Sequence, residues 1–502
     1  MFKKENCKRP KRFHILPQSM GAMMALIAAL FAEVFFLMFI LKLDILPGRF
    51  MIILFGVILL IDAGAMALFN SKKKSGNRVL AGSIVLMLVV NFLVVGSYYL
   101  CSTFDTLQAI SEAKDQSEQY HVIVLKEGSY DKIEDIEGNT VYVIKNNSKM
   151  YKEAEEKLLS KVDVKYEYAS DCVAAGEHLV KKTGETSDEI VFISNTNYEM
   201  LCEDNKEFKK ATQIIYSVSV QIKSNDSARR INVTEDPFNV YITGIDVWGD
   251  IDQVSRSDVN MIMTVNPKTR EVLLTSMPRD SYVELHSFGA LDKLTHSGIY
   301  GVDETISTVE DWMDIEINYY VRVNFSMVVG LVDAIGGIDV KSDYAFKSKV
   351  SDYTYVEGMN HLDGRGALYF ARERKAFKAE DEQRIRNQQI VLEAMLKKIT
   401  SSKVLLTSYV NLLDAVEGKM QTNLSDKDIY SLVKMQLDDM SGWKVKTVSV
   451  HGKGAYKTTF SMGNRELFVS IPEQKSVDAA VQKIHSIMYP ADDGIEKSDF
   501  LL

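Results

Sequence analysis

The stretch Phe370-Ala-Arg-Glu-Arg-Lys375, followed by Asp381-Glu-Gln-Arg-Ile-Arg-Asn-Gln-Gln389, decides how the larger part of this chain is organised. At 100° per residue, a helix from about residue 380 to 400 places Asp381, Arg384 and Gln388 on one face, which apolar side chains then continue. An apolar stripe that points toward a core therefore begins with an acid, a guanidinium and an amide. A guanidinium near a core and near a helix N-terminus needs an anion.

Two interpretations of this tract stay open. In the first, Asp381 pairs with Arg384 in a solvated first turn of the helix. In the second, the guanidinium is held toward the core for a bound anion, because helix N-termini and arginines both bind anions such as phosphate.

Length, charge and cysteine content limit the class of protein. The chain has 502 residues, too many for one ordinary core, so we expect two or more domains. A formal net charge of -9 argues against a protein that binds nucleic acid through phosphate electrostatics. Four cysteines are too few for a disulfide scaffold, and the spacing of Cys172 and Cys202 leaves their pairing open. The histidines at 286, 296 and 361 have no spaced partner, which predicts solvent-facing or packing roles.

Three apolar runs near the N-terminus have the length of membrane-spanning helices. They cover Met20–Leu41, Phe50–Phe69 and Val79–Leu100. Lysines and arginines concentrate in the tail, residues 1–19, and in the connection before the third run, so the positive-inside rule predicts that both are cytoplasmic. With three spans within residues 20–101, everything after about residue 101 is expected to be extracellular.

The sequence pattern of residues 105–225 predicts a small α/β domain, which we call the accessory domain because it precedes the larger one. Its expected strands and helices are 121–125, 140–144, 164–168 and 190–193, and 148–161, 171–182 and 197–211. The polar stretch at 224–237 predicts a linker. No nucleophile, metal cluster or glycine-rich loop stands out, so spacing or partner contact is the expected role.

The sequence pattern of residues 238–490 predicts a larger α/β sandwich, because predicted strands and helices alternate. The expected strands are 238–243, 259–265, 271–276 and 443–450. The expected helices are 301–313, 326–335, 380–400, 403–416 and 425–440.

Charged residues gather at the ends of the predicted strands, where α/β sheets usually carry their chemistry. The first strand runs into Gly244-Ile-Asp246, the second follows Arg256-Ser-Asp258, and the third ends at Met277-Pro-Arg-Asp280. With the first tract, these segments supply Arg256, Arg279, Arg372, Arg374 and Arg384. Guanidinium groups match phosphate oxygens bidentately, and Asp246 and Asp258 are hard oxygen donors that suit Mg²⁺. The alternative is that the arginines form ordinary surface ion pairs.

These motifs, in this order, resemble the LytR-CpsA-Psr family of extracellular glycopolymer transferases. The resemblance covers residues 238–400 and rests on Gly244-Ile-Asp246, Arg256-Ser-Asp258, Pro278-Arg-Asp280, Lys293, Val323-Asn-Phe325, Val332-Asp-Ala-Ile-Gly-Gly337, Arg372-Glu-Arg374, and Asp381 through Arg384 to Gln388. The three-span anchor and the small domain before the motifs are similar to the capsule-associated branch of that family.

The resemblance implies an α/β/α sandwich with a central mixed sheet for residues 238–490. It also implies that a glycan moves from an undecaprenyl diphosphate carrier to peptidoglycan. It implies Mg²⁺ at Asp246 and Asp258, and catalytic roles for Asp258, Arg279 and Asp280. It also implies a diphosphate held by Arg256, Arg279, Arg372, Arg374, Arg384 and Gln388, and a polyprenyl tail in an apolar channel between sheet and helices. Asp280 would orient arginines or act as a base, a role also open to Asp258. Asn387 stands where many members have Arg, so the diphosphate is expected to be held by one guanidinium fewer.

The similarity of the anchor favours a capsular polysaccharide or exopolysaccharide as the transferred polymer, with teichoic acid as the alternative. The membrane and the polysaccharide export machinery are further expected partners. A non-catalytic membrane regulator or scaffold of export is an alternative of another class, and it would tolerate loss of Arg372, Arg374 or Asp258. A transcriptional regulator is disfavoured, because the predicted topology leaves a short tail and one short loop in the cytoplasm.

Overall fold

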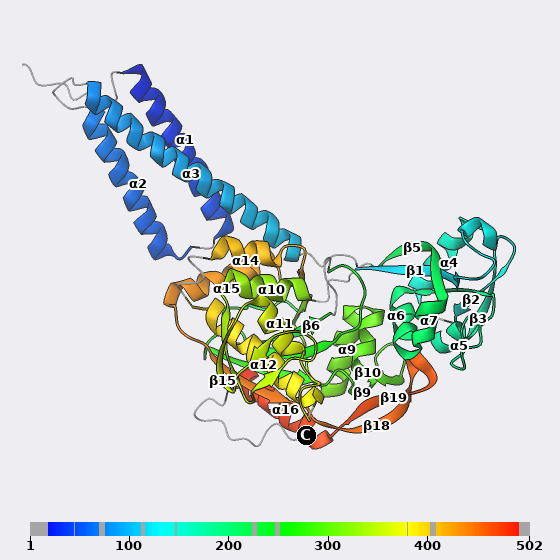
Figure 1. The fold of residues 1–502 in the computed structure, drawn as a ribbon. Helices are drawn as coiled ribbons and strands as arrows, with labels where there is room; N and C mark the ends of the chain where they lie inside the picture. The colour runs from blue at the N-terminus through cyan, green and yellow to red at the C-terminus, as the bar shows by residue number, and fades with distance from the viewer. Residues whose placement is uncertain are drawn as a thin grey trace, which may run out of the picture. The chain divides into compact units, whose positions relative to one another are not determined.

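The computed structural model describes residues 19–44, 46–69, 76–111, 116–145, 148–222, 228–245, 251–378, 380–401 and 408–490 (Figure 1). The chain forms two compact units. The first comprises residues 1–107 and 429–440, and the second comprises residues 108–428 and 441–502.

The first unit contains three apolar helices that are long enough to cross a membrane, which confirms the three predicted spans. They are α1 (Met20–Leu43), α2 (Gly48–Phe69) and α3 (Gly76–Ser111), so the third helix continues past its predicted end. Gly96 of α3 allows close packing against α1, because a Cβ at this position would lie 2.8 Å from the Phe36 ring. The basic residues at 1–18 and 72–74, which predict the orientation, lie outside the described residues, so the orientation stays a prediction.

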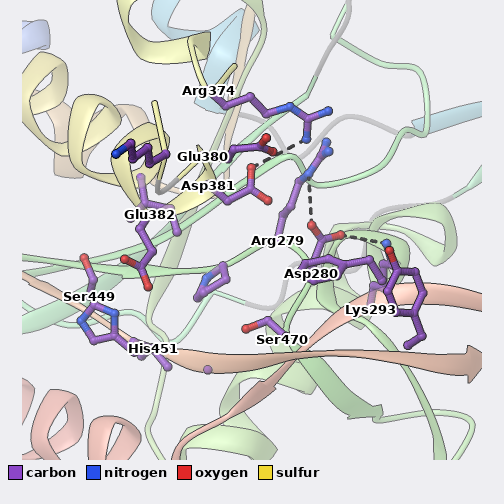
Figure 2. A pocket seen from close by; sticks show the side chains of 18 residues that line it. Arg279, Asp280, Lys293, Arg374, Glu380, Asp381, Glu382, Ser449, His451 and Ser470 are labelled. Carbon is purple, nitrogen blue, oxygen red and sulfur yellow. Dashed lines mark hydrogen bonds and ion pairs between the residues drawn. The ribbon is translucent and has the colours of Figure 1, made fainter. Parts of the chain in front are cut away.

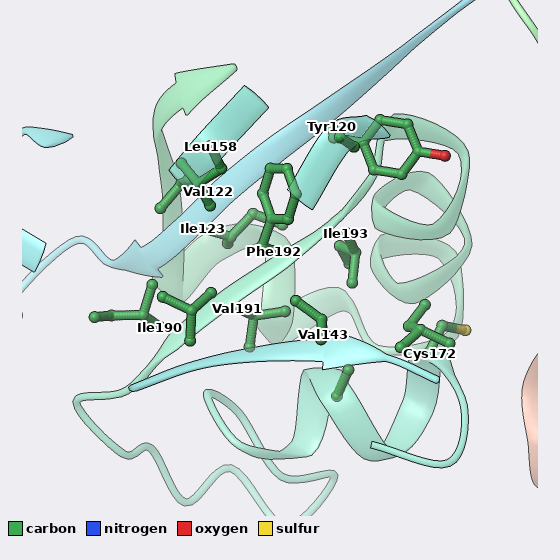
Figure 3. Close-up of a cluster of buried hydrophobic side chains, with 14 of the residues drawn as sticks. Tyr120, Val122, Ile123, Val143, Leu158, Cys172, Ile190, Val191, Phe192 and Ile193 are labelled. Carbon is green, nitrogen blue, oxygen red and sulfur yellow. The ribbon is translucent and has the colours of Figure 1, made fainter. Parts of the chain in front are cut away.

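The second unit begins with a five-stranded mixed sheet in the order β3-β2-β4-β1-β5. Its elements are β1 (Gln116–Leu125), η1 (Ile133–Ile136), β2 (Thr140–Ile144), α4 (Lys149–Leu159), β3 (Lys165–Ala169), α5 (Cys172–Glu177), β4 (Ile190–Ser194), α6 (Asn195–Asp204), α7 (Lys206–Ala211) and β5 (Thr212–Ile222). Val143, Val191 and Phe192 are at most 1% exposed at the centre of its core (Figure 3).

The four strands predicted for this domain are confirmed, but one further strand was missed and one predicted helix is wrong. A fifth strand, β5, pairs along the whole length of β1 and was not predicted. The single helix expected over 197–211 is two helices, because Asn205 ends α6 and its side chain accepts a hydrogen bond from the backbone N–H of Glu207 in α7 (3.1 Å). The predicted domain limits at 105, 225 and 238 stay predictions.

The larger part of the second unit is built on a six-stranded mixed sheet in the order β16-β11-β6-β7-β8-β17. The strands are β6 (Phe238–Gly244), β7 (Val259–Asn266), β8 (Glu271–Met277), β11 (Tyr319–Val323), β16 (Met420–Thr422) and β17 (Lys444–Ser449). β7 runs antiparallel to β6 and β8, whereas β11 is parallel to β6 and β17 is parallel to β8. The four predicted strands are confirmed, while β11 and β16 were not predicted.

Helices cover both faces of this sheet, which confirms the predicted sandwich. Met277 packs in one cluster with side chains of α9 (Val302–Met313) and α16 (Gln474–Met488). The neighbouring Ser276 points to the opposite face, where its hydroxyl accepts a hydrogen bond from Gln389 of α12 (3.0 Å). On that face, α10 (Phe325–Ala334), α11 (Gly364–Arg372), α12 (Glu380–Ile399) and α14 (Tyr409–Val416) form a second cluster.

Smaller elements complete the unit. They are β9 (Tyr282–Leu285), β10 (Ala290–Lys293), α8 (Leu294–Ser297), η2 (Gly298–Tyr300), β12 (Ile338–Ser342), β13 (Phe346–Lys347), β14 (Thr354–Tyr355), β15 (Gly358–Leu362), β18 (Gly452–Thr459), η3 (Phe460–Met462) and β19 (Gly463–Pro472). Helix α15 (Asp426–Asp439) belongs to the first unit from residue 429 onward. The helix predicted over 403–416 is confirmed from residue 409 onward, since 402–407 lie outside the described residues. The antiparallel pair β18–β19, which we call the ribbon, was not predicted.

The ribbon joins the larger domain to the accessory domain. Ile299 and Met462 from the larger domain are buried in the same cluster as the accessory core. The thiol of Cys172 in α5 donates a hydrogen bond to the Ser461 carbonyl (3.2 Å), and both Cys172 and Cys202 are free thiols. His296 is buried, in agreement with the predicted packing role, and its ring hydrogen-bonds Asp292 of β10 (2.7 Å).

Candidate active site

The motifs at the strand ends come together because neighbouring strands of the sheet are antiparallel. Gly244 at the end of β6 is paired with Val259 at the start of β7, and Met277 at the end of β8 is paired with Asn260. The backbone N–H of Asp258 donates to the Gly244 carbonyl (2.8 Å). Asp258 and Arg279 therefore lie at one edge of the sheet. Asp246, the other predicted Mg²⁺ ligand, lies outside the described residues.

The Arg-Glu-Arg motif is organised by its central glutamate. Glu373 follows the last residue of α11 and is fully buried. Its carboxylate accepts hydrogen bonds from the Ser348 hydroxyl (2.7 Å) and from the backbone N–H groups of Lys349 (2.6 Å) and Ala376 (3.1 Å). Burial disfavours the charge, but these hydrogen bonds outweigh it and lower the pKa of Glu373. The sequence analysis missed this anchor, which fixes the turn between the two arginines.

All five predicted arginines line one cavity of about 360 Å³, which we call the cationic cavity. Its lining residues are Glu203, Arg256, Asp258, Val259, Arg279, Phe325, Val350, Arg372, Arg374, Lys375, Arg384 and Gln388. Six of these side chains are basic and two are acidic, so the cavity carries an excess of positive charge. Separate surface ion pairs would not converge in this way. The roles of the individual residues stay predictions.

Arg279 is the centre of the charged network. Its Nη1 lies 2.9 Å from Asp258 Oδ1, and its Nε lies 3.9 Å from Asp280 Oδ2. Burial disfavours the charged guanidinium, but the two carboxylates outweigh burial and raise the pKa of Arg279. The Thr295 hydroxyl also donates to Asp258 Oδ1 (3.2 Å), which fixes the carboxylate that holds the arginine.

Arg384 resolves the two interpretations of the opening tract. Its Nη2 lies 3.2 Å from Asp381 Oδ1, so the ion pair of the first interpretation exists, but only 9% of Arg384 is exposed, as the second interpretation expects. Burial, and then the charge of Arg279, lower the pKa of Arg384. Its buried Nε has no hydrogen-bond partner among the described residues. A bound anion would supply the missing negative charge.

Arg372 and Arg256 are each held by a neighbour. The guanidinium carbon of Arg372 lies 4.1 Å from the centre of the Phe325 ring, a cation–π contact. Arg256 is bound bidentately by Glu203 at the end of α6, with Nη1–Oε2 and Nη2–Oε1 distances of 2.7 and 2.6 Å. The accessory domain thus contributes a carboxylate to the cationic cavity. No motif in the sequence predicted this contact.

Asp280 is fixed between two cations. Its Oδ1 lies 2.9 Å from Lys293 Nζ, and that lysine is mostly buried rather than a free surface residue. Burial would raise the pKa of Asp280, but Lys293 and Arg279 outweigh burial and lower it. A carboxylate with a lowered pKa is a weak proton acceptor. The geometry therefore favours the orienting role over the base role for Asp280.

The residues around the predicted Mg²⁺ site fit a metal in part. The described residues contain no group of three or more Asp, Glu, His or Cys side chains placed to hold a metal ion. Asp258 lines the cavity, and its Oδ1 accepts hydrogen bonds from the Arg279 guanidinium and the Thr295 hydroxyl. Its second oxygen could serve as one ligand, as expected for a hard cation that takes its other ligands from phosphate and water.

Asn387 does not replace the guanidinium that is expected at its position. Its side chain is 1% exposed and donates to the Phe370 carbonyl (3.0 Å). The adjacent Arg386 is exposed and pairs with Asp343 outside the cavity. Gln388 lines the cavity as predicted from the helical face.

A second cavity, of about 710 Å³, shares Arg279 and Arg374 with the first (Figure 2). One wall carries Glu380, Asp381 and Glu382 from the start of α12. The lining also includes Ser449, Val450, His451, Gly452, Gly454, Tyr456, Phe468 and Ser470, from the end of β17, the two residues that follow it, and the ribbon. The sequence analysis gave no indication of this cavity, which we call the ribbon cavity.

Comparison with known proteins identifies the family of this chain. The model of the LytR_cpsA_psr family matches residues 197–483. The polyisoprenyl-teichoic acid–peptidoglycan teichoic acid transferase TagU of Bacillus anthracis is 35% identical over 204 residues, which are 40% of this chain and 66% of TagU. TagU of Bacillus licheniformis is 35% identical over 211 residues, 42% of this chain and 67% of that protein. The crystal structure of B. subtilis TagV aligns with 51% of this chain and 98% of its own, at 25% identity and a TM-score of 0.43. Because the family model matches more than half of its residues, this chain belongs to the LytR-CpsA-Psr family.

Proposed function

We propose that this protein transfers a glycopolymer from a polyprenyl diphosphate carrier to peptidoglycan, at the outer face of the membrane. The observation that carries the proposal is the convergence of Arg256, Arg279, Arg372, Arg374 and Arg384 on one cavity. A diphosphate is the part of such a donor that needs several guanidinium groups at once. The family and the names of the curated relatives support this class of reaction.

The chemistry needs no protein nucleophile. The acceptor hydroxyl attacks, the bond to the carrier breaks, and the leaving lipid phosphate takes the electron pair. Arg279 and Arg384 lie where they would neutralise the charge that builds on that phosphate. Asp258 is the carboxylate in the cationic cavity that could accept the hydroxyl proton, while Asp280 orients Arg279 and Lys293.

Mg²⁺ is part of the proposal, with Asp258 and Asp246 as its protein ligands. When bound, it would neutralise negative charge on the phosphate oxygens. Chelation with EDTA should then reduce the transfer rate, and added Mg²⁺ should restore it. A transfer rate that is unchanged by EDTA would remove the metal from the proposal while leaving the arginines in place.

Two polymer classes are candidates. The three N-terminal helices and the accessory domain favour a capsular polysaccharide or exopolysaccharide, by their similarity to the capsule-associated branch. The names of the curated relatives favour teichoic acid. Parallel assays with a lipid-linked donor of each class distinguish them, and the ratio of the two kcat/KM values decides.

The function is tested with the full chain in detergent or proteoliposomes, a lipid-diphosphate glycan donor and peptidoglycan. Loss of Arg372 (Arg372→Ala) removes one charge-assisted contact to the donor, so we expect kcat/KM to fall by about 10- to 100-fold. Arg386→Ala is the matched control, because Arg386 is an arginine on α12 that pairs outside the cavity. If Arg372→Ala and Asp258→Ala both transfer polymer like the wild type, the regulator or scaffold alternative is the better account.

The lipid product identifies the bond that breaks. Attack on phosphorus releases polyprenyl monophosphate, whereas attack on the anomeric carbon releases polyprenyl diphosphate. Mass spectrometry of the extracted lipid separates these outcomes in the same assay.

A further inference from the structure

The charge of the ribbon cavity differs from that of its neighbour. Its lining includes four basic side chains, of which Arg279 and Arg374 are shared, and four acidic ones. The acids Glu380, Asp381 and Glu382 lie together on one wall (Figure 2). Balanced charge gives little attraction for a second phosphate group, but carboxylates on one wall can accept hydrogen bonds from hydroxyl groups.

A second part of the lining, which we call the aromatic wall, presents two rings of the ribbon. Tyr456 and Phe468 are paired across the ribbon, with ring centres 6.0 Å apart, and they are 68% and 44% exposed. Gly454 makes room for this arrangement, because a Cβ at that position would lie 2.9 Å from the Phe468 ring. Exposed aromatic rings offer apolar faces to a ligand that also needs polar contacts.

The aromatic wall is fixed to the reaction centre. The backbone N–H of Ser470, two residues from Phe468, donates to the Asp280 carbonyl (2.7 Å). The Tyr282 hydroxyl, which follows the same motif in the chain, donates to the Thr458 carbonyl (2.8 Å). The ribbon therefore holds its rings in register with the residue that orients Arg279.

We propose that the ribbon cavity is a saccharide subsite, in which a neutral sugar ring packs on Tyr456 and Phe468 and donates hydroxyl hydrogen bonds to the acidic wall. The inference rests on the proposed function, since that function places phosphates next door in the cationic cavity. Two sources present this chemistry: the acceptor glycan strand and the first sugar of the donor. In either case, the shared arginines place the sugar beside the phosphates.

Binding of a β-1,4-linked N-acetylglucosamine trisaccharide to the full chain in detergent tests the acceptor source. Tyr456→Ala and Phe468→Ala should each raise the trisaccharide Kd by about tenfold, as expected for loss of one aromatic packing face. Tyr489→Ala is the matched control, because Tyr489 is also 68% exposed but lines neither cavity. Thermal melting of each variant checks that the fold is retained.

A second arm tests the donor source by comparing polyprenyl diphosphate that carries one N-acetylhexosamine with the bare lipid diphosphate. If the donor sugar occupies the cavity, the aromatic variants weaken binding of the sugar-bearing lipid by about tenfold and leave the bare lipid unchanged. The proposal is overturned if both variants behave like Tyr489→Ala in both arms. Because neither arm requires transfer, saccharide binding and the proposed function can fail independently: absent transfer with retained saccharide binding removes only the function.

Discussion

The cationic cavity and the ribbon cavity share Arg279 and Arg374 but differ in everything else that determines a ligand. In the first, six basic side chains outnumber two acidic ones, and three of the arginines, Arg256, Arg279 and Arg384, are mostly buried. In the second, the charges balance and aromatic rings line one wall. A site of this kind separates the place that attracts an anion from the place where a neutral group approaches that anion. The shared arginines are then the point where the two ligands meet.

The largest effect is expected at a shared residue. Arg279→Ala removes a guanidinium from both cavities and leaves Asp258 and Asp280 without their common partner. We expect kcat to fall by roughly 10²- to 10³-fold, the size seen when a preorganised charge-stabilising donor is removed. Arg270→Ala is the control, because Arg270 lies just before the other end of β8 and stacks on Trp443. Equal kcat values for the two variants would mean that the Arg279 guanidinium does not stabilise the charge that develops in the reaction.

A change of intermediate size is expected at Asp381, and it should strengthen ligand binding in the cationic cavity but weaken it in the ribbon cavity. Asp381→Asn removes the negative charge that faces Arg374 and Arg384 but keeps the shape of the side chain. Inorganic pyrophosphate should therefore bind about threefold more tightly, while the trisaccharide binds about threefold more weakly, because the pairs are only partly exposed and one hydrogen-bond acceptor is weakened. Isothermal titration of both ligands measures this. Changes in the same direction would contradict the division of the site.

The smallest effect is expected at the carboxylate from the accessory domain. Glu203→Gln removes the charge that neutralises Arg256, so pyrophosphate should bind about twofold more tightly. The hydrogen bonds from Arg256 lower the pKa of Glu203 below its ordinary 4.5, against the effect of burial. The pair is complete above the ordinary pKa and is lost as the pH falls through the lowered one. The difference between Glu203→Gln and wild type should thus be constant across the neutral range and disappear in acid. Weaker pyrophosphate binding by the variant would show that Glu203 positions Arg256 instead of competing for it.

The sequence alone predicted which residues lie close together where local helical periodicity or the ends of strands determine their positions. The helical face predicted Asp381, Arg384 and Gln388 together, and the strand ends predicted that Asp258 would lie near Arg279. It was insufficient where a contact depends on the packing of distant segments. Glu203 lies in an ordinary amphipathic helix, and its partner is 53 residues away. The ribbon carries no motif, so Tyr456 and Phe468 could be located only after β18 and β19 were paired.

The burial of Ile299 and Met462 among the accessory side chains has a consequence for how this chain can diversify. The predicted linker between the two domains suggests a domain boundary between residues 222 and 238. Division of the chain there would expose Ile299 and Met462, because the accessory side chains that bury them would be removed. Recombination at that boundary would introduce the accessory domain of another protein, which lacks a complementary apolar surface for Ile299 and Met462. We expect the accessory domain and the larger domain to be inherited together, and substitutions at their shared contacts to be coordinated. Exchange of the accessory domain between relatives should give a folded protein only when the ribbon is exchanged with it.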